Sequence, residues 1–129
     1  MSEKTIAQKM LIKPGHTVWV INPPAGYLEG PGALPPGAIS VATAEAPVDV
    51  IQIFVRNRQE LEAQLPALKS LLKPTGLLWV CYTKGTSKKY KTDIHRDSIN
   101  AYAASLGLVG VAMIALDEDW SALRLKLAI

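Results

Sequence analysis

The sequence predicts an α/β fold with a mixed, mostly parallel sheet, and two regions of the chain carry this prediction. Residues 48–82 have the pattern of strand, helix and strand, because residues 48–55 and 77–82 are almost continuously apolar. Two buried strands joined by an amphipathic helix form a right-handed parallel crossover. Residues 108–116 are also apolar, and residues 120–129 alternate between apolar and polar side chains, which predicts a half-buried antiparallel strand. We therefore expect a three-layer, Rossmann-like sheet with helices on both faces that ends in an antiparallel hairpin.

The helix within the crossover has a clear start and a proline inside it. Asn57 is a favourable N-cap residue, and Glu60 follows three positions later, which is close to a capping box. Leucines then recur at helical spacing and form one apolar stripe. Pro66 lacks the N–H that would bond to the carbonyl of Glu62, so we expect a kink or a restarted helix there. Residues 74–76, Pro-Thr-Gly, are expected to end the helix.

Shorter patterns predict the remaining elements. A short helix is expected over residues 4–11, and strands are expected over residues 17–21 and within residues 38–43. A second long helix is expected to begin at Thr92 or Asp93 and to end just before a glycine.

Residues 22–37 contain five prolines and four glycines, a density that excludes a helix or a central strand. One hypothesis is a shaped binding loop over the end of the first strand. The alternative is a loop that is left where a helix was lost, and the residues alone favour neither.

Composition and charge exclude several classes of protein. The chain has 129 residues, of which 49% are hydrophobic and 19% charged, so we expect one globular domain and not a disordered chain. A net charge of +3 permits contact with nucleic acid without favouring it. Cys81 is the only cysteine, which excludes internal disulfides and a multi-cysteine zinc site, and His16 and His95 lack ligand spacing. Because no apolar run reaches membrane-spanning length, we expect a cytoplasmic protein.

Several motifs together carry a resemblance to a known fold family. They are Lys13-Pro14-Gly15 before the first strand, the strand that begins at residues 48–51, the helix and strand within residues 71–80, and the final hairpin. In this order they resemble the first, fourth, fifth and last two strands of the class I S-adenosylmethionine-dependent methyltransferase fold. More narrowly, the segments Lys-Pro-Gly-His, Asn-Pro-Pro-Ala-Gly-Tyr, Ile-Phe-Val-Arg-Asn-Arg and Asp-Glu-Asp-Trp-Ser resemble a small bacterial family of unknown function, not known to be catalytic. The resemblance implies one shortened methyltransferase-like domain over residues 1–129.

The chain departs from the family pattern where the cofactor would bind. The resemblance implies an acidic residue and spaced glycines after the first strand, but this chain has Asn22-Pro23-Pro24 there. The carboxylate expected after the second strand has only Glu45 as a poor candidate. We therefore predict no cofactor, with S-adenosylmethionine as the disfavoured alternative. The Asn-Pro-Pro segment is also similar to the amine-holding motif of amino-directed methyltransferases, but it follows the first strand and not the fourth.

Open α/β sheets bind ligands at the carboxyl ends of their parallel strands. Four loops are expected to meet there, at residues 22–27, 56–58, 82–84 and 117–120. The predicted pocket residues are Asn22, Tyr27, Arg56, Arg58, Tyr82 and Lys84, and the positive charge of this set favours an anionic small molecule. The alternative is that each charge is simply solvated, with one arginine paired to Glu118.

Three function classes remain open at this stage. The first is a non-catalytic scaffold that binds a small molecule or a protein, and the second is a methyltransferase with a degenerate cofactor motif. The third is a weak nucleic-acid binder that uses the lysine-rich loop at residues 84–91, which we consider less favoured than a solvated loop. No catalytic residue is predicted, since Cys81 is expected to be a packing residue. A thinly covered sheet further suggests a homodimer.

Overall fold

The chain forms a six-stranded sheet with the strand order β2-β1-β3-β4-β6-β5. A computed structural model describes residues 6–24, 27, 34–35, 37–41, 43, 46–85, 92–116 and 119–127. The elements within these ranges are α1 (Ile6–Lys9), β1 (Thr17–Ile21), β2 (Ile39–Val41), β3 (Val48–Val55), α2 (Arg58–Leu68), the 3₁₀ turn η1 (Lys69–Leu71), β4 (Leu72–Thr83), α3 (Arg96–Ser105), β5 (Leu108–Ala115) and β6 (Trp120–Leu127).

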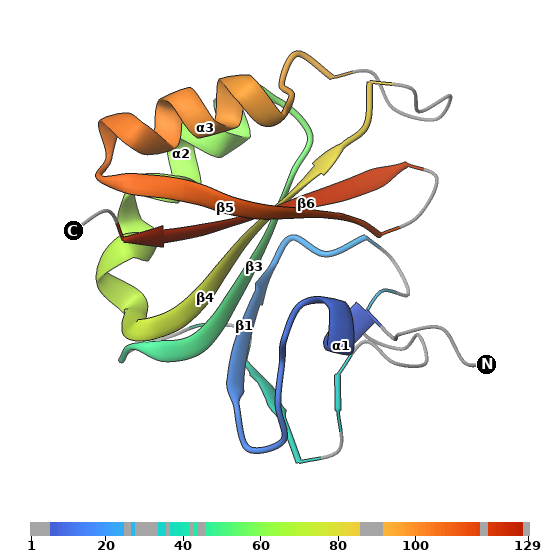
Figure 1. The fold of residues 1–129 in the computed structure, drawn as a ribbon, viewed down its shortest axis with the longest axis vertical. Helices are drawn as coiled ribbons and strands as arrows, with labels where there is room; N and C mark the ends of the chain where they lie inside the picture. The colour runs from blue at the N-terminus through green and yellow to red at the C-terminus, as the bar shows by residue number, and fades with distance from the viewer. Residues whose placement is uncertain are drawn as a thin grey trace.

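The sheet is mixed, as the sequence predicts. Strands β2, β1, β3 and β4 are parallel, whereas β6 runs antiparallel to both β4 and β5. Figure 1 shows α2 and α3 together on one side of the sheet and α1 on the other. The Rossmann-like α/β fold and its antiparallel hairpin are therefore confirmed.

Each face of the sheet carries its own hydrophobic core. On the first face, alternate residues of β3, β4 and β6 pack with α2 and α3. On the second face, the other residues of these strands and of β1 pack with α1 and with parts of the loop that follows β1. Because β3 lies between two covered faces, every residue of the strand except Asp49 is buried. This double burial explains why the strand is so evident in the sequence.

The start of α2 is predicted correctly, but Pro66 does not restart the helix. The side chain of Asn57 accepts the backbone N–H of Glu60 at 2.9 Å, as expected of an N-cap residue. The helix then continues through Pro66 to its end at Leu68. The carbonyl of Glu62, which loses its helical partner to the proline, accepts the Tyr102 hydroxyl at 3.4 Å. A contact from α3 thus partly replaces the missing hydrogen bond.

The N-cap of α3 is His95, so the prediction of Thr92 or Asp93 is wrong. The His95 imidazole accepts the Ser98 N–H at 3.4 Å, and the Ser98 hydroxyl accepts the His95 N–H at 2.9 Å. Asp93 instead accepts the backbone N–H of the first residue of α2 at 2.8 Å. At the other end of α3, Gly107 has φ of +79°, which confirms it as the glycine that ends the helix.

β4 begins earlier than predicted because its first part contains a bulge. Leu72 pairs with Val48, and Leu77 pairs with Val50, so residues 73–76 of β4 lie opposite the single residue Asp49 of β3. The Pro-Thr-Gly segment therefore lies within the strand and is not a simple helix terminator. In the sequence the two roles look the same, because both place proline and glycine after a leucine stripe.

β6 is more buried than a half-buried strand. Ser121, Ala122 and Leu123 are all buried, and the alternation expected of such a strand appears only from Arg124, which is half-buried, to Lys126, which is exposed. The reason is the position of β6 between β4 and β5, where its first half is covered on both faces.

Some predictions concern residues outside the described ranges, or properties that the fold does not test. Glu45, the lysines at residues 86–91 and the turn at residues 117–118 belong to the first group. The single-domain organisation and the homodimer stay predictions, although the edge strand β5 does expose Val109 and Met113. Across the helices that the structure describes, none has the length and apolar character needed to cross a membrane.

Asp49 connects three strands at the amino edge of the sheet. One carboxylate oxygen accepts the backbone N–H of Thr17, at the start of β1, at 2.8 Å, and the other accepts from Lys73 Nζ of β4 at 3.0 Å. The Thr17 N–H and, to a lesser extent, Lys73 hold the pKa of Asp49 below its ordinary value, against the opposing effect of burial. The ionised carboxylate is therefore the form that stabilises the fold.

We predict that Asp49→Asn lowers the free energy of unfolding by about 1 kcal/mol at pH 7. Because the folded-state pKa lies below the unfolded value of about 3.9, the stabilisation is present above that pH and is lost as the pH falls through the folded-state pKa. Urea unfolding of the parent and of the Asp49→Asn variant, at pH 7 and near pH 2.5, measures the difference in their free energies of unfolding. The difference should shrink at low pH, and an equal difference at both values would contradict the assignment.

Candidate functional site

The loop after β1 begins at the carboxyl edge of the sheet with an unusual backbone conformation. Asn22 directly follows β1, is exposed and has φ of +54°. Asparagine tolerates this left-handed region better than most residues, and such conformations occur often at functional sites. The loop then turns back, since the N–H of Tyr27 donates to the carbonyl of Pro24 at 3.1 Å. Asn22 therefore marks the place where the chain leaves the sheet.

Tyr27 packs against the second face of the sheet. Its hydroxyl donates to Gln52 Oε1 at 2.8 Å, and its ring meets Phe54 edge to face with centroids 4.7 Å apart. Burial raises the pKa of Tyr27 far above its ordinary value, so the phenol remains protonated. Gln52, which is fully buried, also donates to Met10 Sδ at 3.2 Å. Tyr27 thus anchors the loop after β1, and Gln52, the amide within an apolar strand, is the partner that the sequence analysis missed.

The two predicted arginines lie at the start of α2 and do not join a pocket with Tyr82. Arg58 Nε donates to Glu62 Oε2 at 2.7 Å within the helix, and the Arg58 side chain is 66% exposed. Arg56 is exposed as well. For Arg58 the observed partner is Glu62, four residues along the same helix, and this spacing is readable in the sequence. The alternative hypothesis of solvated loop charges describes Arg58 better than the pocket hypothesis.

Tyr82 and Lys84 do lie together, in a pocket of about 340 Å³ at the carboxyl end of β4. The Tyr82 hydroxyl donates to Met113 Sδ at 3.2 Å, and the backbone N–H of Lys84 donates to the carbonyl of Asp119 at 2.8 Å. Tyr82 belongs to the core on the face that α2 and α3 cover, whereas Tyr27 packs on the opposite face. The six predicted residues are therefore divided among three places. The full lining consists of Tyr82, Lys84, Gly85, His95, Arg96, Asp97, Met113 and Ser121.

Thr83, the last residue of β4, has a buried hydroxyl without a hydrogen-bond partner among the described residues. It is fully buried, and within the described part of the chain its Oγ1 has no hydrogen-bond partner. Its side chain points to the face opposite Tyr82, because successive residues of a strand alternate. A buried hydroxyl without a partner costs about 1–3 kcal/mol, so Thr83 lowers the stability of the fold at this position. Phe54 and Trp120, whose ring centroids are 5.3 Å apart, pack on the same face.

Cys81 lies in the hydrophobic core of the second face. The thiol is fully buried, and burial raises its pKa far above the ordinary value, so it stays protonated. This agrees with the predicted packing role.

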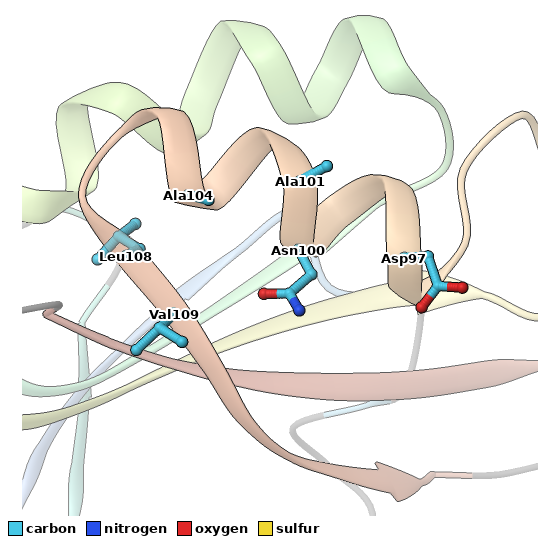
Figure 2. A pocket seen from close by; sticks show the side chains of 6 residues that line it. All are labelled: Asp97, Asn100, Ala101, Ala104, Leu108 and Val109. Carbon is cyan, nitrogen blue, oxygen red and sulfur yellow. The ribbon is translucent and has the colours of Figure 1, made fainter.

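A second hollow lies between α3 and β5 and has a different character. Its volume is about 530 Å³, and Figure 2 shows Asn100 pointing from α3 toward β5. Asn100 Oδ1 accepts the N–H of Gly110 at 3.0 Å, so this side chain supports the edge strand. Among the described residues no three His, Cys, Asp or Glu side chains are grouped as metal ligands. The hollow is lined by Asp97, Asn100, Ala101, Ala104, Leu108 and Val109.

Solved structures with this architecture identify the fold. The ribosomal protein L11 methylase of Lactobacillus delbrueckii subsp. bulgaricus aligns with a TM-score of 0.60 over 95% of this chain and 74% of its own, at 13% identity. The fold is that of class I S-adenosylmethionine-dependent methyltransferases. A TehB-like methyltransferase of Corynebacterium glutamicum aligns with a TM-score of 0.55 over 93% of this chain and 84% of its own, at 10% identity. No protein-family model and no curated protein matches the sequence.

The prediction of no cofactor is corrected by two further structures with the methyltransferase fold. DhpI, which aligns with a TM-score of 0.55 over 86% of this chain and 76% of its own at 10% identity, was solved as a complex with S-adenosylhomocysteine. LepI, with a TM-score of 0.50 over 95% of this chain and 39% of its own at 16% identity, was solved with S-adenosylmethionine. The argument for no cofactor rested on the loss of the acidic residue and the spaced glycines after β1, and on the lack of a good carboxylate after the second strand. It gave too much weight to these two loops in a fold in which neighbours hold this ligand.

Proposed function

We propose that the protein binds S-adenosylmethionine at the carboxyl ends of β1 and β2 and acts as a methyltransferase. The observation that carries this proposal is the methyltransferase fold, shared over 86–95% of the chain with proteins solved with this cofactor or its product. The carboxyl ends of parallel strands are also the general ligand position of such sheets. The non-catalytic scaffold is less favoured, because no comparison supports it.

The residues after β1 fit the amino-acid part of this ligand through acceptors. Pro23 and Pro24 have no N–H, but prolines keep their carbonyl oxygens, although that of Pro24 already accepts the Tyr27 N–H. The Asn22 amide both donates and accepts. An ammonium group needs acceptors, so the loss of two donors does not remove its partners. The left-handed backbone of Asn22 supports the same location. When bound, S-adenosylmethionine supplies an electrophilic methyl group.

The other residues of this edge have a positioning role in the proposal. Tyr27 and Gln52 hold the loop after β1 against the sheet through their 2.8 Å hydrogen bond. The buried Thr83 hydroxyl lies on the same face and has no partner among the residues described. Tyr27 and Gln52 are therefore positioning residues, and the Thr83 hydroxyl is itself too buried to touch a ligand.

Calorimetry with S-adenosylmethionine and S-adenosylhomocysteine tests the proposal. Ligand at about 100 times its dissociation constant should stabilise the protein by about 2.7 kcal/mol, which a thermal-shift measurement also detects. Asn22→Gly should weaken binding about tenfold without unfolding the protein, because glycine adopts this φ without strain. Arg58→Gln, in the surface pair with Glu62, is the control and should bind as the parent does. The absence of heat and of a thermal shift at millimolar ligand would overturn the proposal.

A further inference from the structure

We infer that the pocket at the carboxyl end of β4 binds the anionic group, a carboxylate or a phosphate, of a small molecule. The pocket of about 340 Å³ is a separate site from the proposed cofactor position. It opens beside Tyr82, on the sheet face that α2 and α3 cover, whereas the loop after β1 is anchored on the opposite face through Tyr27. The inference therefore does not depend on cofactor binding.

Two cationic side chains from different elements line this pocket. Lys84 comes from the end of β4, where its backbone N–H is held by the Asp119 carbonyl at 2.8 Å, and Arg96 comes from the first residue of α3. Arg96 Nε makes a long contact of 3.4 Å with Asp97 Oδ1, and both side chains are more than half exposed. An exposed pair of this length contributes little, so the guanidinium keeps most of its donors for a ligand.

Tyr82 adds a donor whose present partner is weak. Its hydroxyl donates to Met113 Sδ at 3.2 Å, and a thioether sulfur is a poor acceptor. A charged oxygen is a much stronger acceptor, so an anion in the pocket would take this hydrogen bond from the sulfur. Burial raises the pKa of Tyr82, although the charge of Arg96 opposes this effect, so the phenol keeps its proton at neutral pH. Ser121, also on the lining, hydrogen-bonds with the Tyr82 side chain and places a second hydroxyl beside it.

The balance of charge gives the pocket its selectivity. Lys84 and Arg96 face a single carboxylate, Asp97, so the lining favours an anion over a cation. The guanidinium fork and the neighbouring hydroxyls match the oxygens of a carboxylate or a phosphate. Neither Lys84 nor Arg96 has a role in the proposed cofactor site.

Titration of the full chain followed by ¹H–¹⁵N NMR tests this inference. Inorganic phosphate and sodium acetate are added in separate experiments at constant ionic strength, without S-adenosylmethionine. We expect saturable shifts of the Lys84, Arg96 and Ser121 amides and of the Arg96 Nε–H. Saturation by one probe only identifies which anion the pocket prefers. Non-saturable shifts spread over the whole surface would overturn the inference.

Matched variants separate this pocket from a general effect of charge. Arg96→Gln and Lys84→Gln should each weaken the binding of the probe about tenfold. Arg124→Gln removes the same charge from β6, where the side chain lines a different hollow near Leu77, and it should bind as the parent does. If Arg96→Gln and Lys84→Gln both keep a dispersed spectrum and the parent's affinity, the assignment is wrong. The cofactor calorimetry has its own readout, so failure of one proposal does not imply failure of the other.

Discussion

Phe54→Ala should lower the free energy of unfolding by about 3–5 kcal/mol, the range for removing a large buried aromatic side chain. Phe54 is 1% exposed and meets both Tyr27 and Trp120 edge to face, with ring centroids 4.7 Å and 5.3 Å away. Its removal leaves a cavity and also deprives the loop after β1 of its packing surface. Chemical denaturation of the parent and the variant measures the difference.

Phe54→Leu is the matched control for this effect. Leucine keeps most of the apolar volume, so we expect a loss of about 1 kcal/mol, together with the loss of the two aromatic contacts. If the alanine variant were no less stable than the leucine variant, the ring would not be the centre of the packing beneath the carboxyl edge. Weaker cofactor binding by the leucine variant would further link this packing to the proposed site.

Gly76→Ala should destabilise the protein by about 2–3 kcal/mol, although it adds only one methyl group. A Cβ at Gly76 would lie 2.7 Å from the Leu72 side chain and 3.0 Å from the carbonyl oxygens of Asp49 and Lys73. The leucine side chain can move, but the two carbonyls belong to the backbone of β3 and β4. The bulge therefore needs a glycine here because of close approach, since no positive φ is required at this position.

Gly85→Ala provides the control for Gly76→Ala. Apart from Gly85 itself and its two chain neighbours, no residue has an atom within 4 Å of a Cβ at Gly85, and its φ is not positive. We therefore expect a change within about 0.5 kcal/mol. Thermal or urea unfolding of both variants gives the comparison. Equal stability of the two variants would show that the bulge can relax without cost.

The elements that the sequence predicts best are those whose burial is simplest. β3 is found at its true bounds because both of its faces are covered, which produces a continuous apolar run. The cap of α3 was missed because Thr92, Asp93 and His95 are all followed by residues that suit a helix. Asp93 instead accepts the backbone N–H of Arg58, which lies 35 residues away in the chain. A prediction from neighbouring residues does not include such a contact. Tertiary contacts thus decide where this helix begins.

The candidate site was predicted as an edge of the sheet, and the separation of its faces was not foreseen. Tyr82 lies near the carboxyl end of β4, and Tyr27 lies in the loop after β1. The two side chains nevertheless pack on opposite faces of the sheet. The alternation within β4 shows that Tyr82 and Thr83 point to opposite sides, yet it does not say which side meets the loop after β1. Arg96 was missed as a pocket residue because only the packing of α3 on the sheet brings it beside Lys84.

The position of β6 has a consequence for synthesis of the protein. β6 follows β5 in the chain, yet in the sheet it lies between β5 and β4. During translation, at about 5–20 residues per second, β4 emerges a few seconds before the strand that covers its edge. In that interval β4 can pair only with β3, so apolar residues such as Leu78 and Val80, which are fully buried in the finished fold, lie along a strand with one unpaired edge. The sheet can therefore reach its final strand order only after translation of Trp120–Leu127, and until then the free edge of β4 is open to pairing with other strands.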